Sequence, residues 1–462
     1  MRYLSTRGGV APVGFADAVM MGLGTDGGLL VPETIPRVAP ETLRAWARLD
    51  FADLATEVLA LYVGDALPRA DLAALVQRAY ASFAHPEVTP VVSAAGRHWL
   101  ELFHGPTAAF KDVALQLLGN LFEYLLVRDG GCLNILGATS GDTGSAAIYG
   151  VRGKAGIQIF ILHPKGRVSP VQERQMTTVL DANVHNIAVA GTFDDAQRLV
   201  KTLFNDLPFK TARQLGAVNS INWARILAQT VYYFYAWGRL SGGDPSTRAS
   251  FAVPTGNFGD IFAGYLARRM GLPVGRLIIA TNRNDILTRF VATGRYRAGA
   301  VYQTLSPAMD IQVASNFERY LYYLHDEDPG AVRALFASME QKGEIAVDAG
   351  RLERVQADFT ASAVSDADCL AAIRAVHAAA GYIICPHTAV AAQAAVAHPD
   401  AVILATAHPA KFNEAVIAAI GHPAPPPPCL EGLLEREYRC AELPADPAAL
   451  RAFIEQTLAA GG

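Results

Sequence analysis

Short apolar runs alternate with amphipathic segments from Trp99 onward. Runs of this length are typical of strands buried on both faces, and the segments between them carry apolar residues at helical spacing. Such alternation favours parallel β-sheets covered by helices on both faces, which is an α/β fold. The runs predict strands at Leu133–Leu136, Ile157–Leu162, Val184–Val189, Phe251–Val253, Leu277–Ala280, Tyr382–Ile384 and Val402–Thr406.

Helices are predicted between these strands. The clearest start signal is Thr192, which precedes the helical pattern of residues 193–204 and is followed by two aspartates in the first turn. The first ninety or so residues differ from the rest, because helical stretches such as Pro40–Ala47 and Ala70–Phe83 dominate them. Further helices are predicted at Ser145–Tyr149, Pro170–Thr178 and Gly259–Met270.

Composition argues against several classes of protein. Hydrophobic residues make up 51% of the 462 residues and charged residues 18%, so the chain can bury a large core. The net charge of -4 offers no basic excess for nucleic acid, and no apolar run reaches the roughly 20 residues of a membrane-spanning helix. The N-terminus lacks the apolar segment of a secretory signal, so a cytoplasmic location is expected. Five cysteines without a CxxC pair, and no HExxH motif, give no indication of a metal site.

Lys111 lies in the first loop that carries candidate chemistry. It follows the Gly105-Pro106 turn and stands at or near the start of a predicted helix over residues 112–122. The positive end of the helix dipole and partial burial beside Phe110 would both favour the neutral, nucleophilic amine. A lysine that forms a Schiff base needs these properties. An ordinary solvated surface lysine is the alternative.

Two Gly-rich loops each follow a predicted strand and open a helix. In residues 137–145, Gly141 and Gly144 let the backbone approach an anion, and hydroxyls such as those of Ser140 and Thr143 could surround a phosphate or carboxylate. Residues 253–261 fit neither the Walker A pattern nor GxGxxG, and so short a loop suits a compact monophosphate on backbone amides. Ordinary capped or tight turns are the alternatives.

The loop after the last predicted strand adds two candidates. Thr406 stands at the carboxyl end of that strand, where its hydroxyl could meet a ring nitrogen, and Lys411 could meet an anionic group of a substrate. His408 and His387 are each isolated histidines, which are more often structural than catalytic.

With these loops in place, the chain resembles the threonine synthases of the longer class found in enterobacteria and fungi. The resemblance runs nearly from end to end, and its motifs occur in family order. They are Arg7-Gly8, Gly24–Pro32, His104–Asp112, Ala138–Ser145, Asn219–Ile226, Gly256–Asp260, Ser306–Ile311, Ser315–Arg319 and Thr406–Phe412.

The resemblance implies a fold-type-II, tryptophan synthase beta-like enzyme that depends on pyridoxal 5'-phosphate. Its reaction would convert O-phospho-L-homoserine and water to L-threonine and phosphate by γ-elimination and β-addition of water. Lys111 would be the Schiff-base lysine and Thr406 the partner of the pyridine nitrogen, and Asp142 would lie near the ring hydroxyl. The cofactor phosphate would be held by Gly256, Asn257, Phe258 and Gly259. Candidates for the substrate's carboxylate and phosphate are Thr107, Ser140, Gly141, Thr143, Asn222, Arg225 and Lys411.

We expect three parts in the architecture and keep two alternatives for the function. An N-terminal helical domain is predicted over residues 1–95, a large cofactor-binding α/β domain over 96–111 and 216–462, and a small α/β domain over 112–215. The first alternative function is a phospho-lyase that releases 2-oxobutyrate from the same substrate. The second is a non-catalytic protein that binds phosphorylated ligands. A monomer and a homodimer are both compatible with the resemblance, and neither a nucleic-acid nor a membrane partner is expected.

Overall fold

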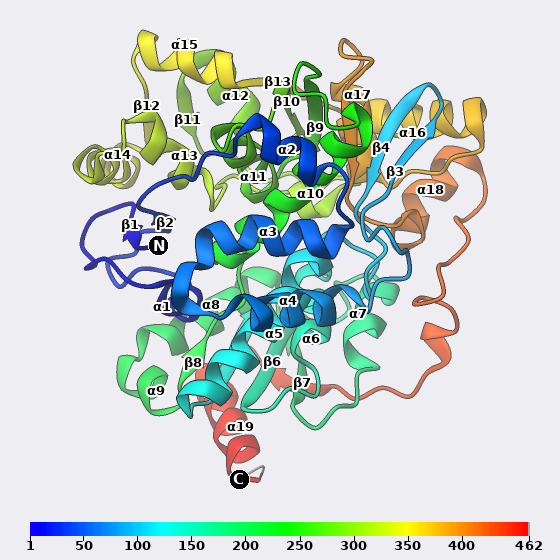
Figure 1. Cartoon of the computed structure of the whole chain (residues 1–462). Helices are drawn as coiled ribbons and strands as arrows, with labels where there is room; N and C mark the ends of the chain where they lie inside the picture. Colours follow the sequence, from blue (N-terminus) through cyan, green and yellow to red (C-terminus); the bar gives the residue numbers. More distant parts are fainter. Residues whose placement is uncertain (461–462) are drawn as a thin grey trace. The chain divides into compact units, whose positions relative to one another are not determined.

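The computed structural model describes residues 1–460, which form two compact units. Unit 1 comprises residues 1–114 and 220–425, and unit 2 comprises residues 115–219 and the chain from Pro426 onward. Most helices and strands of both units are labelled in Figure 1. The chain first leaves unit 1 inside α5 (Lys111–Asp129), so the first turn of this helix belongs to unit 1.

Unit 1 is built on a six-stranded sheet with the strand order β13-β10-β9-β14-β4-β3. Its first five strands are parallel, and only β3 runs antiparallel to its neighbour β4. The carboxyl ends of the parallel strands therefore meet at one edge, where α/β proteins place their ligands. The strands are β3 (Val91–Ala94), β4 (Arg97–Glu101), β9 (Ala249–Pro254), β10 (Val274–Thr281), β13 (Phe359–Ala363) and β14 (Val402–Ala405).

Helices pack against both faces of this sheet. Neighbouring residues of a strand point to opposite faces. In β9, Ala252 belongs to a hydrophobic cluster with the helices near the C-terminal end of unit 1, whereas Phe251 contacts Tyr233 of α10 at 4.9 Å between ring centroids. The helices are α1 (Phe15–Met21), α2 (Pro40–Trp46), α3 (Phe51–Val63), α4 (Arg69–Tyr80), α10 (Trp223–Ser241), α11 (Gly259–Arg269), α12 (Ile286–Thr293), α13 (Phe317–Leu324), α14 (Pro329–Lys342), α15 (Ala349–Asp358), α16 (Asp366–Ala380), α17 (Pro386–Ala394) and α18 (Asn413–Ile420).

Smaller elements complete unit 1. Two antiparallel ribbons stand apart from the main sheet, and they pair β1 with β2 and β11 with β12. Three short 3-10 helices lie in its connections. The bounds are β1 (Tyr3–Ser5), β2 (Leu30–Pro32), β11 (Arg295–Arg297), β12 (Glu344–Ala346), η1 (Gly64–Ala66), η2 (Pro307–Met309) and η3 (Pro409–Phe412).

Unit 2 contains a five-stranded parallel sheet with the order β15-β7-β6-β5-β8. One face of it is covered by a cluster that includes Leu199 of α8 and Ile454 of α19. The predicted cap of α8 is confirmed, because Thr192 and Asp195 form a reciprocal capping box. The elements are β5 (Leu133–Ala138), α6 (Asp142–Val151), β6 (Ile157–Pro164), α7 (Pro170–Thr177), β7 (Val184–Ala190), α8 (Phe193–Asn205), α9 (Leu207–Ala212), β8 (Leu215–Gly216), η4 (Leu433–Glu435), β15 (Ala441–Pro444) and α19 (Pro447–Ala460).

Two parts of the sequence-based architecture differ from the structure. The strand predicted at Tyr382–Ile384 is wrong, because this segment is irregular and leads directly into α17, with Pro386 in its first turn. Its apolar character serves packing instead, since Tyr382 contacts Trp99 at 5.3 Å between ring centroids. The residues beyond 425 were assigned to the larger domain, whereas β15 pairs with β7 in the sheet of unit 2.

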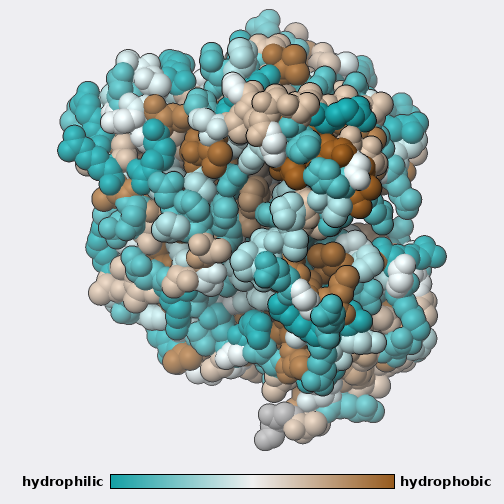
Figure 2. All heavy atoms as spheres, turned by 90° about the vertical axis from the view of Figure 1, so that its right-hand side faces the viewer, coloured by the Kyte–Doolittle hydropathy of each residue, from teal (hydrophilic) through white to brown (hydrophobic). Residues whose placement is uncertain are grey.

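The burial of hydrophobic residues agrees with the large core that the composition predicts. Most large hydrophobic side chains are buried, and on the face drawn in Figure 2 polar residues predominate while hydrophobic ones form small separate patches. Within residues 1–460, no helix has both the length and the apolar character needed to cross a bilayer.

Candidate active site

Backbone hydrogen bonds join the loops that follow β4 and β14. The amide of Leu102 donates to the carbonyl of Ala405 at 3.0 Å, which extends the pairing of the two strands. Further along, Phe110 donates to the Thr406 carbonyl at 2.8 Å, and His408 donates to the Ala108 carbonyl at 3.0 Å. These contacts bring the backbone of Thr406 directly beside the residue that precedes Lys111.

Lys111 is the first residue of α5, as the sequence predicted, and its exposed fraction is only 8%. The turn before it requires a positive φ of 55° at Ala108. The Lys111 ammonium lies 4.7 Å from the centroid of the Phe110 ring, within cation–π range. A solvated surface lysine is therefore excluded, and the side chain has the burial that a reactive amine needs.

A buried group of polar side chains supports this turn. Asp112 accepts hydrogen bonds from the backbone amide of Thr107 at 2.8 Å and from its hydroxyl at 2.6 Å. Burial raises the pKa of Asp112 to about 6, while the Thr107 hydrogen bonds and the charge of Lys411 oppose the shift. Lys411, also buried, donates from Nζ to the Thr107 carbonyl at 2.7 Å. Thr107 and Lys411, both predicted to bind substrate, thus contact each other and the start of α5.

The predicted phosphate loop connects β9 to α11. Phe258 adopts a left-handed conformation with φ 64°, and α11 begins at Gly259. A Cβ atom on Gly256 would lie 2.8 Å from the Ala308 carbonyl oxygen, so a larger residue does not fit there. The first amides of a helix have no acceptor within the helix and bind anions well. The loop therefore fits the phosphate group of a cofactor.

Asn316 holds the phosphate loop in place through hydrogen bonds. Its backbone amide and its side-chain amide both donate to the Asn257 carbonyl, at 3.0 and 3.2 Å, and Nδ2 also reaches the Ser220 carbonyl at 3.1 Å. The buried guanidinium of Arg319 donates to Asn316 Oδ1 and to the Ile221 carbonyl. The phosphate loop and the segment that opens α10 are thereby held by one pair of side chains.

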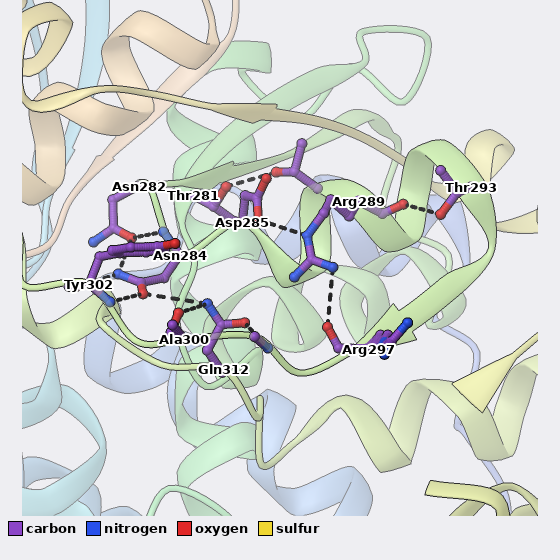
Figure 3. A network of polar contacts seen from close by, with 12 residues as sticks. Thr281, Asn282, Asn284, Asp285, Arg289, Thr293, Arg297, Ala300, Tyr302 and Gln312 are labelled. Carbon is purple, nitrogen blue, oxygen red and sulfur yellow. Dashed lines mark hydrogen bonds and ion pairs between the residues drawn. The ribbon is translucent and has the colours of Figure 1, made fainter. Parts of the chain in front are cut away.

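A second polar network holds the segment that contains Ala308. At the end of β10, Asn284 exchanges two hydrogen bonds with the backbone of Tyr302, each of 2.8 Å, and Gln312 donates to the Ala300 carbonyl at 3.0 Å (Figure 3). Asn282 donates to Asp310 at 2.7 Å. Because residues on both sides of Ala308 are tied down, its carbonyl stays against Gly256.

Asp260, directly after the phosphate loop, is a buried residue that sequence reasoning did not single out. Its Oδ1 accepts hydrogen bonds from the hydroxyls of Tyr232 and Tyr233, at 2.5 and 3.0 Å. Burial raises the pKa of Asp260 to about 6, and the two tyrosines and the positive charge of Lys111 work in the opposite direction. In the sequence, the signal that could have pointed to Asp260 is the adjacent pair Tyr232 and Tyr233 within a largely apolar helical segment.

Arg225 carries a buried positive charge in the first turn of α10. Its exposed fraction is 2%, and within residues 1–460 its Nε and Nη1 atoms have no hydrogen-bond partner. Burial lowers the pKa of Arg225 to about 10, so the group stays charged at neutral pH. Asn222 caps the same helix: its Oδ1 accepts from Ala224 at 3.0 Å, and its Nδ2 donates to the Val19 carbonyl at 2.8 Å. Arg225 is thus suited to bind an anion, whereas Asn222 already has partners.

The remaining candidates lie in unit 2, in the loop between β5 and α6. Gly141 has a φ of 140°, which favours glycine. Thr139 Oγ1 accepts from the amides of Gly141 and Gly144, at 3.0 and 2.9 Å, and this shapes the loop. Ser140 is exposed and Thr143 half-buried. The buried Asp142 accepts a hydrogen bond of 2.9 Å from Gln172.

The two histidines have structural contacts. His408 caps η3 by accepting from the Ala410 amide at 3.2 Å, and burial lowers its pKa to about 4, so it is neutral. His387 accepts from the Ala308 amide at 3.2 Å. In the part of the chain that is described, no group of three or more His, Cys, Asp or Glu side chains could hold a metal ion.

Three family profiles match the chain, and together they cover most of it. "Threonine synthase N terminus" matches residues 2–80, "Pyridoxal-phosphate dependent enzyme" matches residues 88–335, and "Threonine synthase, C-terminal" matches residues 388–454. The second profile spans more than half of the chain and includes Lys111 and the phosphate loop. The cofactor of the chain is therefore pyridoxal phosphate.

Similarity to individual proteins extends over the whole length. The threonine synthase of Pseudomonas aeruginosa is 48% identical, over 99% of this chain and 98% of the relative. The crystal structure of pyridoxal-phosphate-bound threonine synthase from Brucella melitensis is 46% identical with a TM-score of 0.96, and that of threonine synthase from yeast is 44% identical with a TM-score of 0.95; each match covers 99% of both chains. The chain therefore belongs to the threonine synthase family of pyridoxal-phosphate-dependent enzymes.

Proposed function

We propose that this chain is a threonine synthase, a carbon–oxygen lyase that converts O-phospho-L-homoserine and water to L-threonine and phosphate. The observation that carries the proposal is the position of Lys111. This buried lysine starts α5, and the residue before it is hydrogen-bonded to the backbone of Thr406. Relatives at 48% identity and solved structures at 46% and 44% identity bear the name threonine synthase.

We propose a role in binding pyridoxal phosphate for each predicted cofactor residue. Lys111 binds the cofactor covalently through Nζ, and residues 256–259 hold the phosphate group on backbone amides at the start of α11. Thr406, directly after β14, would hydrogen-bond to the ring nitrogen, and Asp142 is proposed as the partner of the ring hydroxyl. When bound, the cofactor withdraws electrons from the substrate's Cα and makes its proton acidic.

The substrate carries two anionic groups, a carboxylate and a phosphate. Arg225 is the strongest candidate to bind one of them, because a buried guanidinium with unpaired N–H groups costs several kcal/mol unless an anion joins it. In the loop of residues 137–145, the candidates to bind the other anionic group are Ser140, Gly141 and Thr143. The remaining predicted substrate residues are Thr107, Asn222 and Lys411, whose polar groups have partners within the chain.

Lys111 also moves the protons of the reaction. Once the substrate amine has replaced it, the free Nζ takes the proton from the substrate's Cα as a general base. Loss of the γ-phosphate requires a second deprotonation, at Cβ, and water then adds at Cβ on one face. A hydroxyl at position 406, unlike a carboxylate, does not enforce protonation of the ring nitrogen, and we propose that this tempers electron withdrawal and limits side reactions.

The test is a coupled assay of two products from O-phospho-L-homoserine. Purified enzyme with pyridoxal phosphate is expected to form threonine and phosphate in equal amounts and little 2-oxobutyrate. Dominant 2-oxobutyrate would favour the phospho-lyase, and no turnover together with no visible cofactor absorption would favour a non-catalytic binding protein. In Thr406→Asp, an unchanged ratio of threonine to 2-oxobutyrate would count against the role given to the hydroxyl.

We propose that the enzyme acts in the cytoplasm without nucleic-acid partners, which the five free cysteines and the net charge of -4 support. Residues 1–95 are proposed as a separate N-terminal domain, since the N-terminal family profile matches residues 2–80. A monomer or a homodimer is proposed, and sedimentation would distinguish them.

A further inference from the structure

The phosphate loop packs against the start of α13. Asn316, the N-cap residue of this helix, donates from Nδ2 to the Asn257 carbonyl at 3.2 Å, and a Cβ atom on Gly259 would lie 3.2 Å from the same Nδ2 atom. Between these two loop residues, the Phe258 ring contacts the Phe317 ring with 5.3 Å between their centroids. Because residues 257–259 all lie against the start of α13, a shift of this helix would move the phosphate loop.

The guanidinium of Arg319 joins α13 to two other segments of unit 1. The side chain is fully buried, with an exposed fraction of 0%, and each of its three nitrogen atoms donates a hydrogen bond. Nε donates to the Leu30 carbonyl in β2 at 3.0 Å, Nη2 donates to the Ile221 carbonyl just before α10, and Nη1 donates to Asn316 Oδ1. A planar guanidinium has donors in fixed directions, so it can hold three segments in one geometry, which a lysine ammonium does less well.

Glu318, the neighbour of Arg319 in α13, binds the same N-terminal ribbon. Its carboxylate accepts hydrogen bonds from Arg7 Nε and Nη2, at 3.1 and 2.9 Å, and from the Thr6 hydroxyl at 2.6 Å. Thr6 and Arg7 directly follow β1, which pairs with β2. Two adjacent side chains of α13 therefore attach this helix to both strands of the ribbon, and the contacts of α13 extend the connection to the phosphate loop.

We propose that Arg319 is a positioning residue for the phosphate group of the cofactor: it anchors α13 to the N-terminal ribbon and to the start of α10, and thereby keeps the backbone amides of residues 256–259 in the arrangement that binds the phosphate. The inference rests on the proposed assignment of residues 256–259 to this group. All three nitrogen atoms of Arg319 donate within the chain, so it acts through Asn316 and α13. Loss of Arg319 should therefore weaken binding of the phosphate group and spare the reaction of the cofactor aldehyde with Lys111.

The test compares two ligands that differ only in the phosphate group. Pyridoxal phosphate and pyridoxal both carry the reactive aldehyde, and only the first can use the phosphate loop. The Kd of each is measured by absorption titration of protein freed of cofactor, for wild type and Arg319→Lys. In the variant the Kd of pyridoxal phosphate is expected to rise about tenfold, because directed hydrogen bonds are lost, while that of pyridoxal should change less than about twofold. An unchanged ratio of the two Kd values in folded Arg319→Lys would overturn the proposal.

Arg239 provides a matched control at the other end of α10. It also donates to two backbone carbonyls, those of Ala47 and Leu49 at 3.0 and 3.1 Å, so Arg239→Lys should leave the ratio of the two Kd values unchanged. An equal change in both lysine variants would mean that the ratio reports general loosening, and the proposal would fail. Asn316→Ala removes the side chain through which Arg319 acts and should shift the ratio in the same direction as Arg319→Lys. If Arg319→Lys does not fold, as judged by circular dichroism, an unchanged ratio in Asn316→Ala overturns the proposal.

Gly256→Ala separates this inference from the assignment on which it rests. The added methyl group alters the phosphate loop itself, so this variant should bind pyridoxal phosphate more weakly and pyridoxal nearly as well as wild type. A changed ratio in Gly256→Ala together with an unchanged ratio in Arg319→Lys would refute the role of Arg319 alone. An unchanged ratio in Gly256→Ala would refute the assignment of residues 256–259 to the cofactor phosphate, whatever Arg319→Lys shows.

Discussion

The amide of Phe110 donates a 2.8 Å hydrogen bond to the carbonyl of Thr406. This contact joins two residues that are 296 positions apart in the chain and belong to the loops after β4 and β14. These strands are parallel neighbours in the sheet of unit 1. Strand pairing therefore positions the backbone at Lys111 and Thr406, the residues that would bind the cofactor covalently and at its ring nitrogen.

Replacing Lys111 should abolish the reaction without unfolding the protein. Lys111→Arg keeps a positive charge but removes the amine that binds the cofactor and moves the proton. Threonine formation is expected to fall by about three orders of magnitude or more, and the visible absorption of the bound cofactor should disappear. Lys165→Ala, which removes an exposed lysine, is the matched control and should retain both. Substantial turnover in Lys111→Arg would refute the role of this lysine.

Gly256→Ala should weaken cofactor binding. The added methyl group would lie 2.8 Å from the Ala308 carbonyl oxygen, and that segment cannot yield easily because Asn284 and Asn282 tie it to the end of β10. The phosphate loop must then shift, and the apparent Kd of pyridoxal phosphate is expected to rise about tenfold or more. Fluorescence titration of the cofactor would measure it. Gly350→Ala is the control, since its nearest contact is an ordinary 3.6 Å, and an equal effect in both variants would contradict the argument.

Arg225→Met should make the ligand-free protein more stable and its binding of substrate weaker. In the absence of ligand the buried guanidinium has no hydrogen-bond partner for Nε and Nη1 within residues 1–460, so a methionine of similar length is expected to raise the free energy of unfolding by about 1–3 kcal/mol. The same change removes a substrate anion partner and should raise KM for O-phospho-L-homoserine at least about tenfold. Urea unfolding of ligand-free protein and steady-state kinetics would test the two effects. A destabilised variant with unchanged KM would show that the arginine is structural.

Much of this site could be predicted from the sequence, because several of its features are formed by residues close together in the chain. Lys111 at a helix start and the Gly256–Gly259 turn before α11 follow from residues close in the chain, and the structure has both. The alternation of strands and helices, which predicts parallel sheets, is likewise a pattern of residues close in the chain. Pattern alone failed at Tyr382–Ile384, where apolar residues pack against Trp99 without joining a strand.

The features that could not be predicted from the sequence depend on contacts between residues far apart in the chain. Asp260 is held by two tyrosines on another helix, and neither of them is adjacent to it in the chain. In the same way, the Arg319–Asn316 pair that fixes the phosphate loop is recognised only once the loop and α13 are seen together. Such residues look like ordinary charged positions until the fold is known.

Asp112 should make stability depend on pH in a direction opposite to that of a typical aspartate. Burial raises its pKa from 3.8 to about 6 in the folded chain. Between these values the unfolded chain has lost the proton and the folded chain still holds it, so the free energy of unfolding falls as pH rises from about 4 to 6 and is flat above. Relative to Asp112→Asn, wild type should lose on the order of 1–3 kcal/mol across this window.

The measurement is the urea midpoint of ligand-free wild type and variant at intervals from pH 4 to 8. Asp195→Asn is the control with the opposite sign, because hydrogen bonds from Thr192, followed by one from Arg198, lower the pKa of Asp195 to about 2. Its contribution to stability is complete above about pH 4 and is lost only below, so its difference from wild type should be constant over the same range. A difference for Asp112→Asn that is also constant, or that grows in favour of wild type with pH, would mean that Asp112 is ionised in the folded chain well below pH 6. The Thr107 hydrogen bonds and the Lys411 charge would then outweigh its burial.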